Sequence, residues 1–272
     1  MRARLIARGR PVREQLVVEQ DRTTGSRLKR YSQAADVDYW TEMWQRSANV
    51  SYERERRGHL PHQLRATFRR WVRPGARTLE AGCGLGHFTV AIDAMGYRAE
   101  GLDWSETTIE RLRNRFSSIQ WHVGDVRRLQ FDDRTFDAIY SPGVCEHFID
   151  GPVEVLEETR RVLKPGGIAV ISTPCFNQWL QRRTGRLISR TASLDESAFY
   201  EYAFTVDGMA GALERLGFEV RQTRPYAALD TLMRYGGWRV PRALTNPLAY
   251  SMDCLPIVRN WGSTCIWVAS KR

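Results

Sequence analysis

The stretch from Thr78 to Phe88, "TLEAGCGLGHF", places three glycines between a short apolar run and a segment with helical spacing. Glycines at positions 82, 84 and 86 let a backbone come close to a ligand, because glycine lacks a side chain and tolerates positive φ. The helix that follows offers unpaired N–H groups at its N-terminus, which suit an anionic group. Glycine-rich turns recur in α/β proteins, so a purely structural tight turn stays open at this point.

On both sides of this stretch, short apolar runs alternate with helical patterns. Strands are expected over residues 77–81, 98–103, 119–124, 136–141 and 168–173, and helices over 88–96, 105–116 and 152–163, with a turn at 164–167. Strands that alternate with helices predict an α/β fold, in which a parallel sheet is covered by helices on both faces. Ligands of such sheets lie outside the carboxyl ends of the strands, so this edge is where a site is expected.

Composition sets the broad class of protein. The chain has 272 residues, 42% of them hydrophobic, which is enough to fill a sizeable core. Neither an apolar run of membrane-spanning length nor a secretory signal is found, so an intracellular, cytoplasmic protein is expected. The five cysteines are widely spaced and form no C-x-x-C pair. We therefore expect no metal site and no disulfide framework.

The net charge of +10 raises nucleic acid as a partner, but the arginines argue for caution. Of the 41 basic residues 38 are arginine, and they are scattered among acids over the whole length. One concentration, Arg54 to Arg77, holds eight arginines beside Phe68 and Trp71. The solvated face of a helix is favoured there over a nucleic-acid surface, which stays open.

The domain organisation follows from where the regular pattern begins and ends. Residues 1–35 are polar and irregular and are expected to be a flexible leader, followed by a single domain over 36–272. That domain begins with helices over 36–73, and insertions at about 174–205 and 224–262 are expected on the substrate side. In the first helix Tyr39, Trp40, Met43 and Trp44 share one face, either as core or as an aromatic cover over a pocket.

Two residues near the glycines narrow the choice of ligand. Asp103 ends the next expected strand, 21 residues after Gly82, where a carboxylate can accept both hydroxyls of a ribose. A dinucleotide-binding loop would need its third glycine at position 87, which is His87. This spacing argues against NAD and leaves a different ribose-bearing cofactor.

Five motifs in order then point to one family. "LEAGCGLGHFT", "GLDWS", "GDVRRL", "FDAIYSPGVCEHF" and "LKPGGIAVISTP" together resemble the successive motifs of class I S-adenosylmethionine-dependent methyltransferases. The resemblance covers about Thr78 to Pro174, and more loosely the chain from Asp38. It implies a Rossmann-like, mostly parallel seven-stranded sheet whose last strand is antiparallel. It also implies S-adenosyl-L-methionine as the cofactor and methyl transfer as the reaction.

The resemblance also assigns cofactor-binding roles to residues of this chain. Glu80, Gly82, Gly84 and Gly86 match the positions at the methionine part and adenosine, and Ser141 matches a position near the methionine portion. Asp103 matches the acid at the ribose. Trp104, Asp125 and Val126 match the positions at the adenine. Carboxylates favour a cationic sulfonium, and aromatic faces stack on a purine. Two alternatives stay open: Asp125 as a cap of the turn into "VRRL", and Trp104 as core.

A general base is needed if the methyl acceptor is a hydroxyl or an acidic carbon. His147 in "CEHF" follows the fourth expected strand, and its imidazole titrates near neutral pH. We take His147 as the first candidate for the base and Glu146 as the second, with substrate hydrogen bonding or packing as the other roles of His147. His87 and His122 are expected to be structural.

For the substrate, we favour a small molecule methylated at oxygen, such as a sugar, lipid or secondary metabolite. The aromatic side chains expected to cover it are Phe199, Tyr200, Tyr202, Phe204, Trp179, Trp238, Trp40 and Trp44. An RNA or protein methyltransferase is the alternative, although "YSPGV" matches the motif of base-methylating enzymes only at Ser141 and Pro142. A third hypothesis is a scaffold protein that binds the cofactor without catalysing a reaction. Peripheral membrane contact and the oligomeric state stay open.

Overall fold

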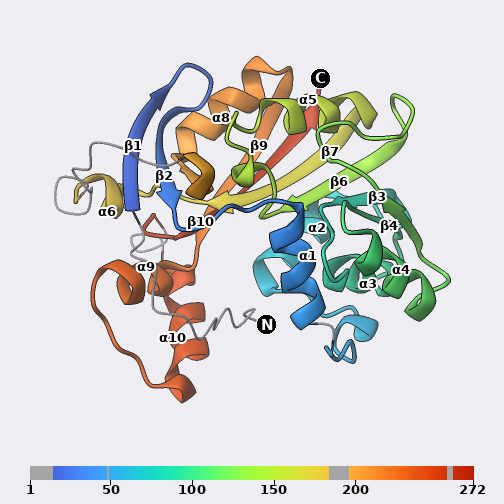
Figure 1. Ribbon diagram of the computed structural model, residues 1–272, viewed down its shortest axis with the longest axis horizontal. Helices are drawn as coiled ribbons and strands as arrows, with labels where there is room; N and C mark the ends of the chain where they lie inside the picture. Colours follow the sequence, from blue (N-terminus) through green and yellow to red (C-terminus); the bar gives the residue numbers. More distant parts are fainter. Residues whose placement is uncertain (1–14, 48, 184–195, 256–259) are drawn as a thin grey trace.

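A seven-stranded sheet forms the centre of the molecule (Figure 1). The computed structural model describes residues 15–47, 49–183, 196–255 and 260–272. Across the sheet the strands are β5 (Gln120–Val123), β4 (Arg98–Asp103), β3 (Arg77–Ala81), β6 (Phe136–Pro142), β7 (Leu163–Pro174), β10 (Thr264–Lys271) and β9 (Phe218–Tyr226). The expected turn at 164–167 is wrong, because these residues belong to β7.

Strand direction confirms the expected fold class. The five strands from β5 to β7 pair in parallel, and β10 runs antiparallel to both of its neighbours, β7 and β9. The last strand of the chain is therefore the antiparallel one in a Rossmann-like sheet. Because β3, β4 and β6 are parallel neighbours, their carboxyl ends meet at one edge.

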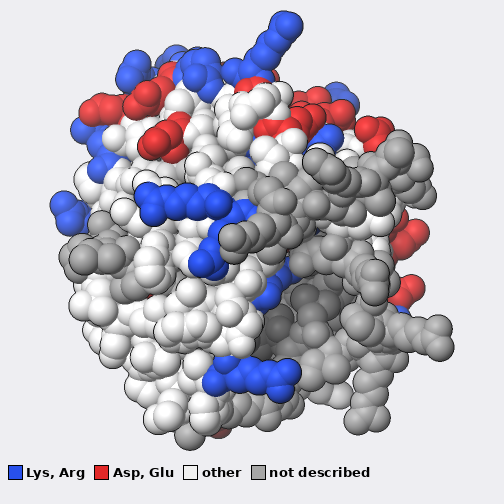
Figure 2. Space-filling view, turned by 90° about the vertical axis from the view of Figure 1, so that its left-hand side faces the viewer, with Lys and Arg blue, Asp and Glu red and all other residues white. Residues whose placement is uncertain are grey.

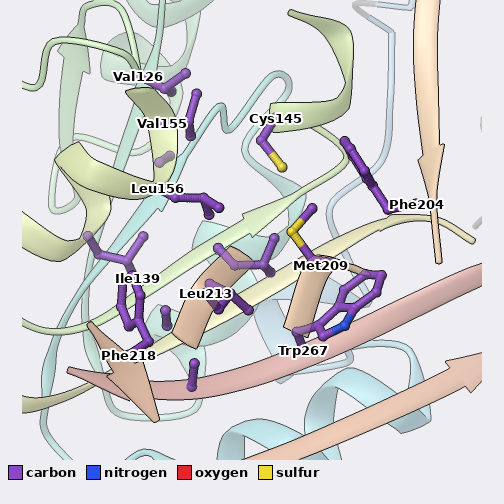
Figure 3. Close-up of a cluster of buried hydrophobic side chains, with 14 of the residues drawn as sticks. Val126, Ile139, Cys145, Val155, Leu156, Phe204, Met209, Leu213, Phe218 and Trp267 are labelled. Atoms are coloured by element: carbon purple, nitrogen blue, oxygen red, sulfur yellow. The ribbon is translucent and has the colours of Figure 1, made fainter. Parts of the chain in front are cut away.

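Helices cover both faces of the sheet because the strands are apolar on both faces. Alternate residues of a strand point to opposite faces, and β10 illustrates this with Trp267 in one core cluster and Ile266 in another. The first cluster lies under α5 (Val153–Val162) and α8 (Val206–Arg215), where Met209 and Leu213 pack near Trp267 (Figure 3). The second lies under α2 (His62–Trp71) and α3 (His87–Ala94). The helix α4 (Glu106–Arg115) packs beside α3 through Ile109.

A second sheet corrects the expected flexible leader. Residues 15–31 form the antiparallel strands β1 (Gln15–Asp21) and β2 (Gly25–Tyr31), and β2 also pairs with β8 (Phe199–Phe204). In the turn of this hairpin Asp21 Oδ1 accepts the N–H groups of Thr23 and Thr24. We refer to these three strands as the accessory sheet; residues 1–14 lie outside the described part of the chain.

Buried charged residues explain why the composition of β1 and β2 suggested a flexible leader. Arg27 and Arg30 of β2 are buried, but each guanidinium has an acidic partner: Glu19 on β1 for Arg27, and Glu201 on β8 for Arg30. A buried charge is tolerated when it is paired and hydrogen-bonded. The partner of Arg30 comes from a distant part of the chain, so sequence composition could not reveal the pairing.

The two expected insertions contain regular structure. The first includes the short helix α6 (Gln178–Gln181), the 3-10 turn η3 (Glu196–Ala198) and β8, and its residues 184–195 lie outside the described part. The second contains α9 (Ala228–Tyr235) and α10 (Arg242–Cys254), which pack together through an apolar cluster. These two helices lie below the accessory sheet in Figure 1. Among the described residues, none of the helices has the length and apolar character to cross a membrane.

Candidate functional site

A cavity of about 1670 Å³ opens at the carboxyl ends of β3, β4 and β6. The helix α1 (Val37–Arg46) borders it, and the glycine-rich loop after β3 forms part of its floor. The predicted site residues that line it are Glu80, Gly82, Gly84, Asp103, Trp104, Val126 and His147. The tertiary structure therefore brings together most of the residues assigned from the motifs.

The glycine-rich loop brings bare backbone to the cavity wall. Gly82 and Gly84 have φ angles of 82° and 48°, a region that side-chain-bearing residues rarely adopt. A Cβ on Gly82 would lie 2.5 Å from Val144, and one on Gly84 would lie 2.8 Å from the ring of Trp44. Both positions therefore require glycine for the backbone conformation and for the close approach of neighbouring groups.

Glu80 ends its strand as a buried carboxylate. Its Oε2 accepts the N–H of Thr89 at 2.7 Å and also the Thr89 hydroxyl, so it holds the first turn of α3. Burial raises the pKa of Glu80 to about 8, although the Thr89 bonds act in the opposite direction. A cation bound beside this side chain would favour its ionised form.

Asp103 is the second buried carboxylate of the cavity. Oδ2 accepts the N–H of Gly84 at 2.8 Å, and Oδ1 accepts the N–H of Ser105 at 3.0 Å. Burial raises the pKa of Asp103, and these backbone bonds oppose the shift. Asp103 thus joins β4 to the glycine loop, and an ionised carboxylate retains acceptor capacity for ligand hydroxyls.

The predicted adenine-side residues divide into two groups. Trp104 and Val126 line the cavity. Asp125 instead forms a salt bridge with Arg127 at 2.7 Å and accepts the Arg127 N–H. It therefore caps the turn that follows it, which is the alternative to an adenine contact that the sequence left open. These two bonds lower the pKa of Asp125 against the effect of burial.

Gly86 and Ser141 hold the loop rather than line the cavity. Gly86 precedes α3, and a Cβ there would lie 2.6 Å from Trp121 on the side of the core. Ser141 is buried and donates a hydrogen bond to the Ala81 carbonyl at 3.0 Å. Both residues position β3 and the loop, so their part in cofactor binding stays a prediction.

His147 lies in the cavity wall, in the 3-10 turn η2 (Cys145–His147). Its Nδ1 lies 2.8 Å from the Tyr200 carbonyl, and its ring packs edge-on against Trp40 and Tyr200 at 4.9 and 5.2 Å. A carbonyl accepts only, so Nδ1 carries the proton and Nε2 has the free lone pair. Burial lowers the pKa of His147, which keeps the imidazole neutral at physiological pH.

Glu146 lies behind His147 and away from the cavity wall. It is 2% exposed, and its Oε2 has no hydrogen-bond partner among the described residues. A ring nitrogen of His147 and one carboxylate oxygen each of Glu146 and Glu201 lie within 4.8 Å of one another. Arg30 is ion-paired to Glu201, and burial raises the pKa of Glu146 well above its usual range. The expectation of no metal site stays a prediction.

Aromatic rings line the part of the cavity near His147. Tyr39, Trp40 and Trp44 of α1 contribute, and Trp40 stacks on Trp44 at 5.5 Å. Every residue of α1 is at least partly exposed, so these rings cover a pocket and do not belong to the core. From β8 only Tyr200 lines the cavity. The other aromatic residues that were expected to cover the substrate do not line the cavity. Phe199, Tyr202 and Phe204 are buried in the core. Trp179 and Trp238 lie outside the cavity wall.

The sequence interpretation missed one side of the cavity. Residues between Asn49 and His62 line it, and among them Glu55 lies 3.3 Å from His87 Nδ1. His87, expected to be structural, faces the cavity and stacks on Tyr52 at 4.6 Å. The sequence offered one signal for this position, because His87 stands where a dinucleotide-binding loop would have its third glycine.

The residues present fit S-adenosylmethionine as a ligand. A nucleoside needs an acceptor for its ribose hydroxyls and a ring to pack on, and Asp103 and Trp104 lie together at one side of the cavity. A sulfonium and an amino group favour carboxylates, and Glu80 meets that need. Gly82 and Gly84 line the cavity, and at both positions the backbone carries no side chain that could fill the space.

Residues 79–171 of the chain carry a methyltransferase domain. The family described as "Methyltransferase domain" matches residues 79–171. A probable S-adenosylmethionine-dependent methyltransferase of Mycolicibacterium smegmatis is 31% identical over 149 residues, covering 55% of this chain and 54% of the relative. A malonyl-[acyl-carrier protein] O-methyltransferase of Erwinia pyrifoliae is 37% identical over 148 residues, 50% of this chain and 56% of the relative. The chain thus spans about half the length of these relatives.

Solved structures agree with the fold. A putative methyltransferase of Haloferax volcanii, in complex with the Trm112 activator, superimposes with a TM-score of 0.56 at 23% identity, over 86% of this chain and 94% of that chain. An S-adenosylmethionine-dependent methyltransferase of Mesorhizobium loti gives a TM-score of 0.53 at 20% identity, over 76% and 96%. These findings confirm the predicted family resemblance, the Rossmann-like fold and S-adenosyl-L-methionine as the cofactor of the domain.

Proposed function

We propose that this protein transfers a methyl group from S-adenosylmethionine to an oxygen atom of a small-molecule acceptor, such as a sugar, lipid or secondary metabolite. One observation carries the proposal: a single cavity holds both the cofactor-type residues Glu80 and Asp103 and a histidine with a free ring nitrogen, His147. Cofactor binding alone would not require a neutral base in the same cavity. This geometry favours catalysis over a binding scaffold.

The cofactor supplies the electrophilic methyl group when it is bound. The chain contributes positioning, through the glycine loop, Asp103 and Trp104, and a base, through His147. Nε2 of His147 accepts the proton of the acceptor hydroxyl, while the Tyr200 carbonyl holds the Nδ1 proton in place.

The walls of the cavity favour an acceptor with an apolar or planar part. Tyr39, Trp40 and Tyr200 form a continuous set of ring contacts around His147. Such rings bind apolar or planar groups, with a few polar atoms giving orientation. A demethylmenaquinone methyltransferase of Staphylococcus carnosus is also a relative, 37% identical over 123 residues, covering 40% of this chain and 50% of that protein. Its name is consistent with a hydrophobic acceptor here.

A nucleic-acid acceptor finds less support in the surface charge. Of the arginines between Arg54 and Arg77, Arg73 pairs with Asp137 and Arg77 pairs with Glu100, so both are engaged within the fold. On the face shown in Figure 2, Lys and Arg lie among Asp and Glu in the upper part, and below it a few separate Lys or Arg side chains lie among mostly uncharged residues. Nucleic-acid binding needs a concentrated basic surface.

The test is a screen for the acceptor. The purified protein is incubated with labelled S-adenosylmethionine and fractionated lipid, sugar and RNA extracts, and products that gain a methyl group are identified by mass spectrometry. We expect labelled products among the small molecules and none in the RNA fraction. Methylated RNA, with RNA binding that falls steeply as salt rises, would overturn the small-molecule proposal. Cofactor binding without any labelled product would favour the scaffold.

A further inference from the structure

The accessory sheet carries a buried charged pair that reaches the back of the candidate base. Arg30 on β2 and Glu201 on β8 are direct cross-strand partners, and the Arg30 Nη1 atom is ion-paired to Glu201 Oε1. The two side chains are 3% and 10% exposed. Neither residue belongs to a cofactor motif, and β2 lies in the segment whose composition predicted a flexible leader.

The same strand that carries Glu201 also orients His147. Tyr200, the preceding residue, accepts the Nδ1 proton through its carbonyl, and the Glu201 carboxylate lies within 4.8 Å of a His147 ring nitrogen. One short segment of β8 thus provides both a hydrogen-bond acceptor and a negative charge to a single imidazole. Arg30 gives the buried Glu201 carboxylate a charged partner.

The groups around His147 come from four elements. Charged or titratable groups are Glu146 of η2, Tyr200 and Glu201 of β8, Arg30 of β2 and Tyr39 of α1. Burial and the charge of Glu201 raise the pKa of Glu146 well above its usual range. Glu146 is therefore a neutral acid, and Glu201 is the carboxylate that carries the negative charge.

We infer that Glu201, held in place by Arg30, is a positioning residue for His147 that stabilises the imidazolium formed when Nε2 takes the proton of the acceptor. This inference rests on the proposed function. The proton moves from the acceptor oxygen to Nε2, the oxygen–methyl bond forms as the sulfur–methyl bond breaks, and the proton later leaves to solvent. The accessory sheet is then part of the reaction machinery and not only a cover.

The charge of Glu201 can be tested on the protein without any acceptor. The chain has five histidines, so histidine-selective ¹³C labelling gives five ring signals, and the signal missing in His147→Gln identifies His147. In Glu201→Gln we expect the proton affinity of His147 to fall about ten-fold, because a carboxylate within a few ångströms stabilises an imidazolium. Glu201→Asp keeps the charge and should retain the affinity within about two-fold.

The matched control is Glu19→Gln, which removes an acid of the same sheet whose partners are Arg27 and Lys29. It should leave the His147 signal unchanged. If Glu201→Gln does not fold, Arg30→Lys is measured instead: it keeps the positive charge but loses the guanidinium that holds Glu201 in place, so the proton affinity of His147 should fall. A purely structural Glu201 would lower the melting temperature in both Glu201 variants without moving the titration of His147, and that result overturns the inference.

Turnover then separates this inference from the proposed function. With the acceptor found by the screen, Glu201→Gln should lower kcat and move the acid limb of the kcat–pH profile to lower pH, with the cofactor Kd unchanged. If the NMR titration shifts but His147→Ala keeps full turnover, the base assignment is wrong while the electrostatic link between Glu201 and His147 holds. If the titration does not shift, the link itself is wrong.

Discussion

The two sides of the cavity differ in how the chain builds them. The cofactor side comes from consecutive strand ends, β3 and β4 with the loops that follow, and uses backbone and carboxylates such as Glu80 and Asp103. The acceptor side comes from distant segments, with Trp40 on α1, His147 on η2 and Tyr200 on β8, and uses rings. The proposed cofactor side is thus built by one edge of the sheet, and the proposed acceptor side by elements added around that edge.

If the two sides are separate in function, a change at one should leave the other intact. The largest effect is expected for His147→Ala, which should lower kcat about 10²- to 10⁴-fold, the usual range for loss of a general base. The Kd for S-adenosylmethionine, measured by calorimetry, should stay the same. Unchanged turnover would refute the base assignment, and a large loss of cofactor affinity would show that the two sides are not independent.

The next largest effect is expected on the cofactor side. Asp103→Ala removes an acceptor for the ribose hydroxyls and leaves the Gly84 N–H without its partner. Binding of S-adenosylhomocysteine should weaken by about 1.5–3 kcal/mol, as expected for hydrogen bonds to a charged group. Ser141→Ala is a useful comparison, because the Ser141 hydroxyl bonds only to the Ala81 carbonyl among the described contacts. Equal losses in both variants would indicate a general defect of the loop.

A smaller effect is expected from the aromatic wall. Trp40→Ala removes the ring contacts to His147 and Trp44. The acceptor KM should rise by an amount that corresponds to about 0.5–1.5 kcal/mol, the contribution of an aromatic pair. The melting-temperature increase caused by S-adenosylhomocysteine should remain. A lost cofactor response with an unchanged acceptor KM would assign Trp40 to the other side of the cavity.

The last prediction concerns pH and Glu80. The folded pKa of about 8 is higher than the ordinary value of 4.5, so the folded state binds more protons than the unfolded state between these values. Stability from this group is complete below about pH 4.5 and is lost as pH rises through about 8. Glu80→Gln should flatten this decline in the free energy of unfolding, measured by urea denaturation between pH 5 and about 8.5.

In the wild type, binding of the cationic cofactor should strengthen over the same pH range, because it favours the ionised Glu80. Glu80→Gln should remove this dependence while keeping a carbonyl oxygen for the Thr89 bonds. Thr41→Ala, a change at a hydroxyl of α1 that contacts Ser105, serves as the control. A pH dependence that survives in Glu80→Gln would point to Asp103, whose pKa is also raised.

The central sheet and the cofactor side could be predicted because their signals are local. The short apolar run of each strand, the glycines at 82 and 84 and the acid at Asp103 all lie in short segments, and parallel topology brings the strand ends together. The accessory sheet could not be predicted in this way. Its buried Arg30 looks like a solvated residue until its partner Glu201 is known, 171 positions away.

Local sequence patterns were sufficient to predict the strands of the central sheet, the order of the motifs and the residue types at the cofactor edge, since each depends on neighbours along the chain. The tertiary structure decided which aromatic residues face the cavity: Tyr200 does, while Tyr202 of the same strand is buried. It also decided the tautomer of His147, through the Tyr200 carbonyl. Both outcomes depend on contacts between segments distant in the chain, which no local pattern encodes.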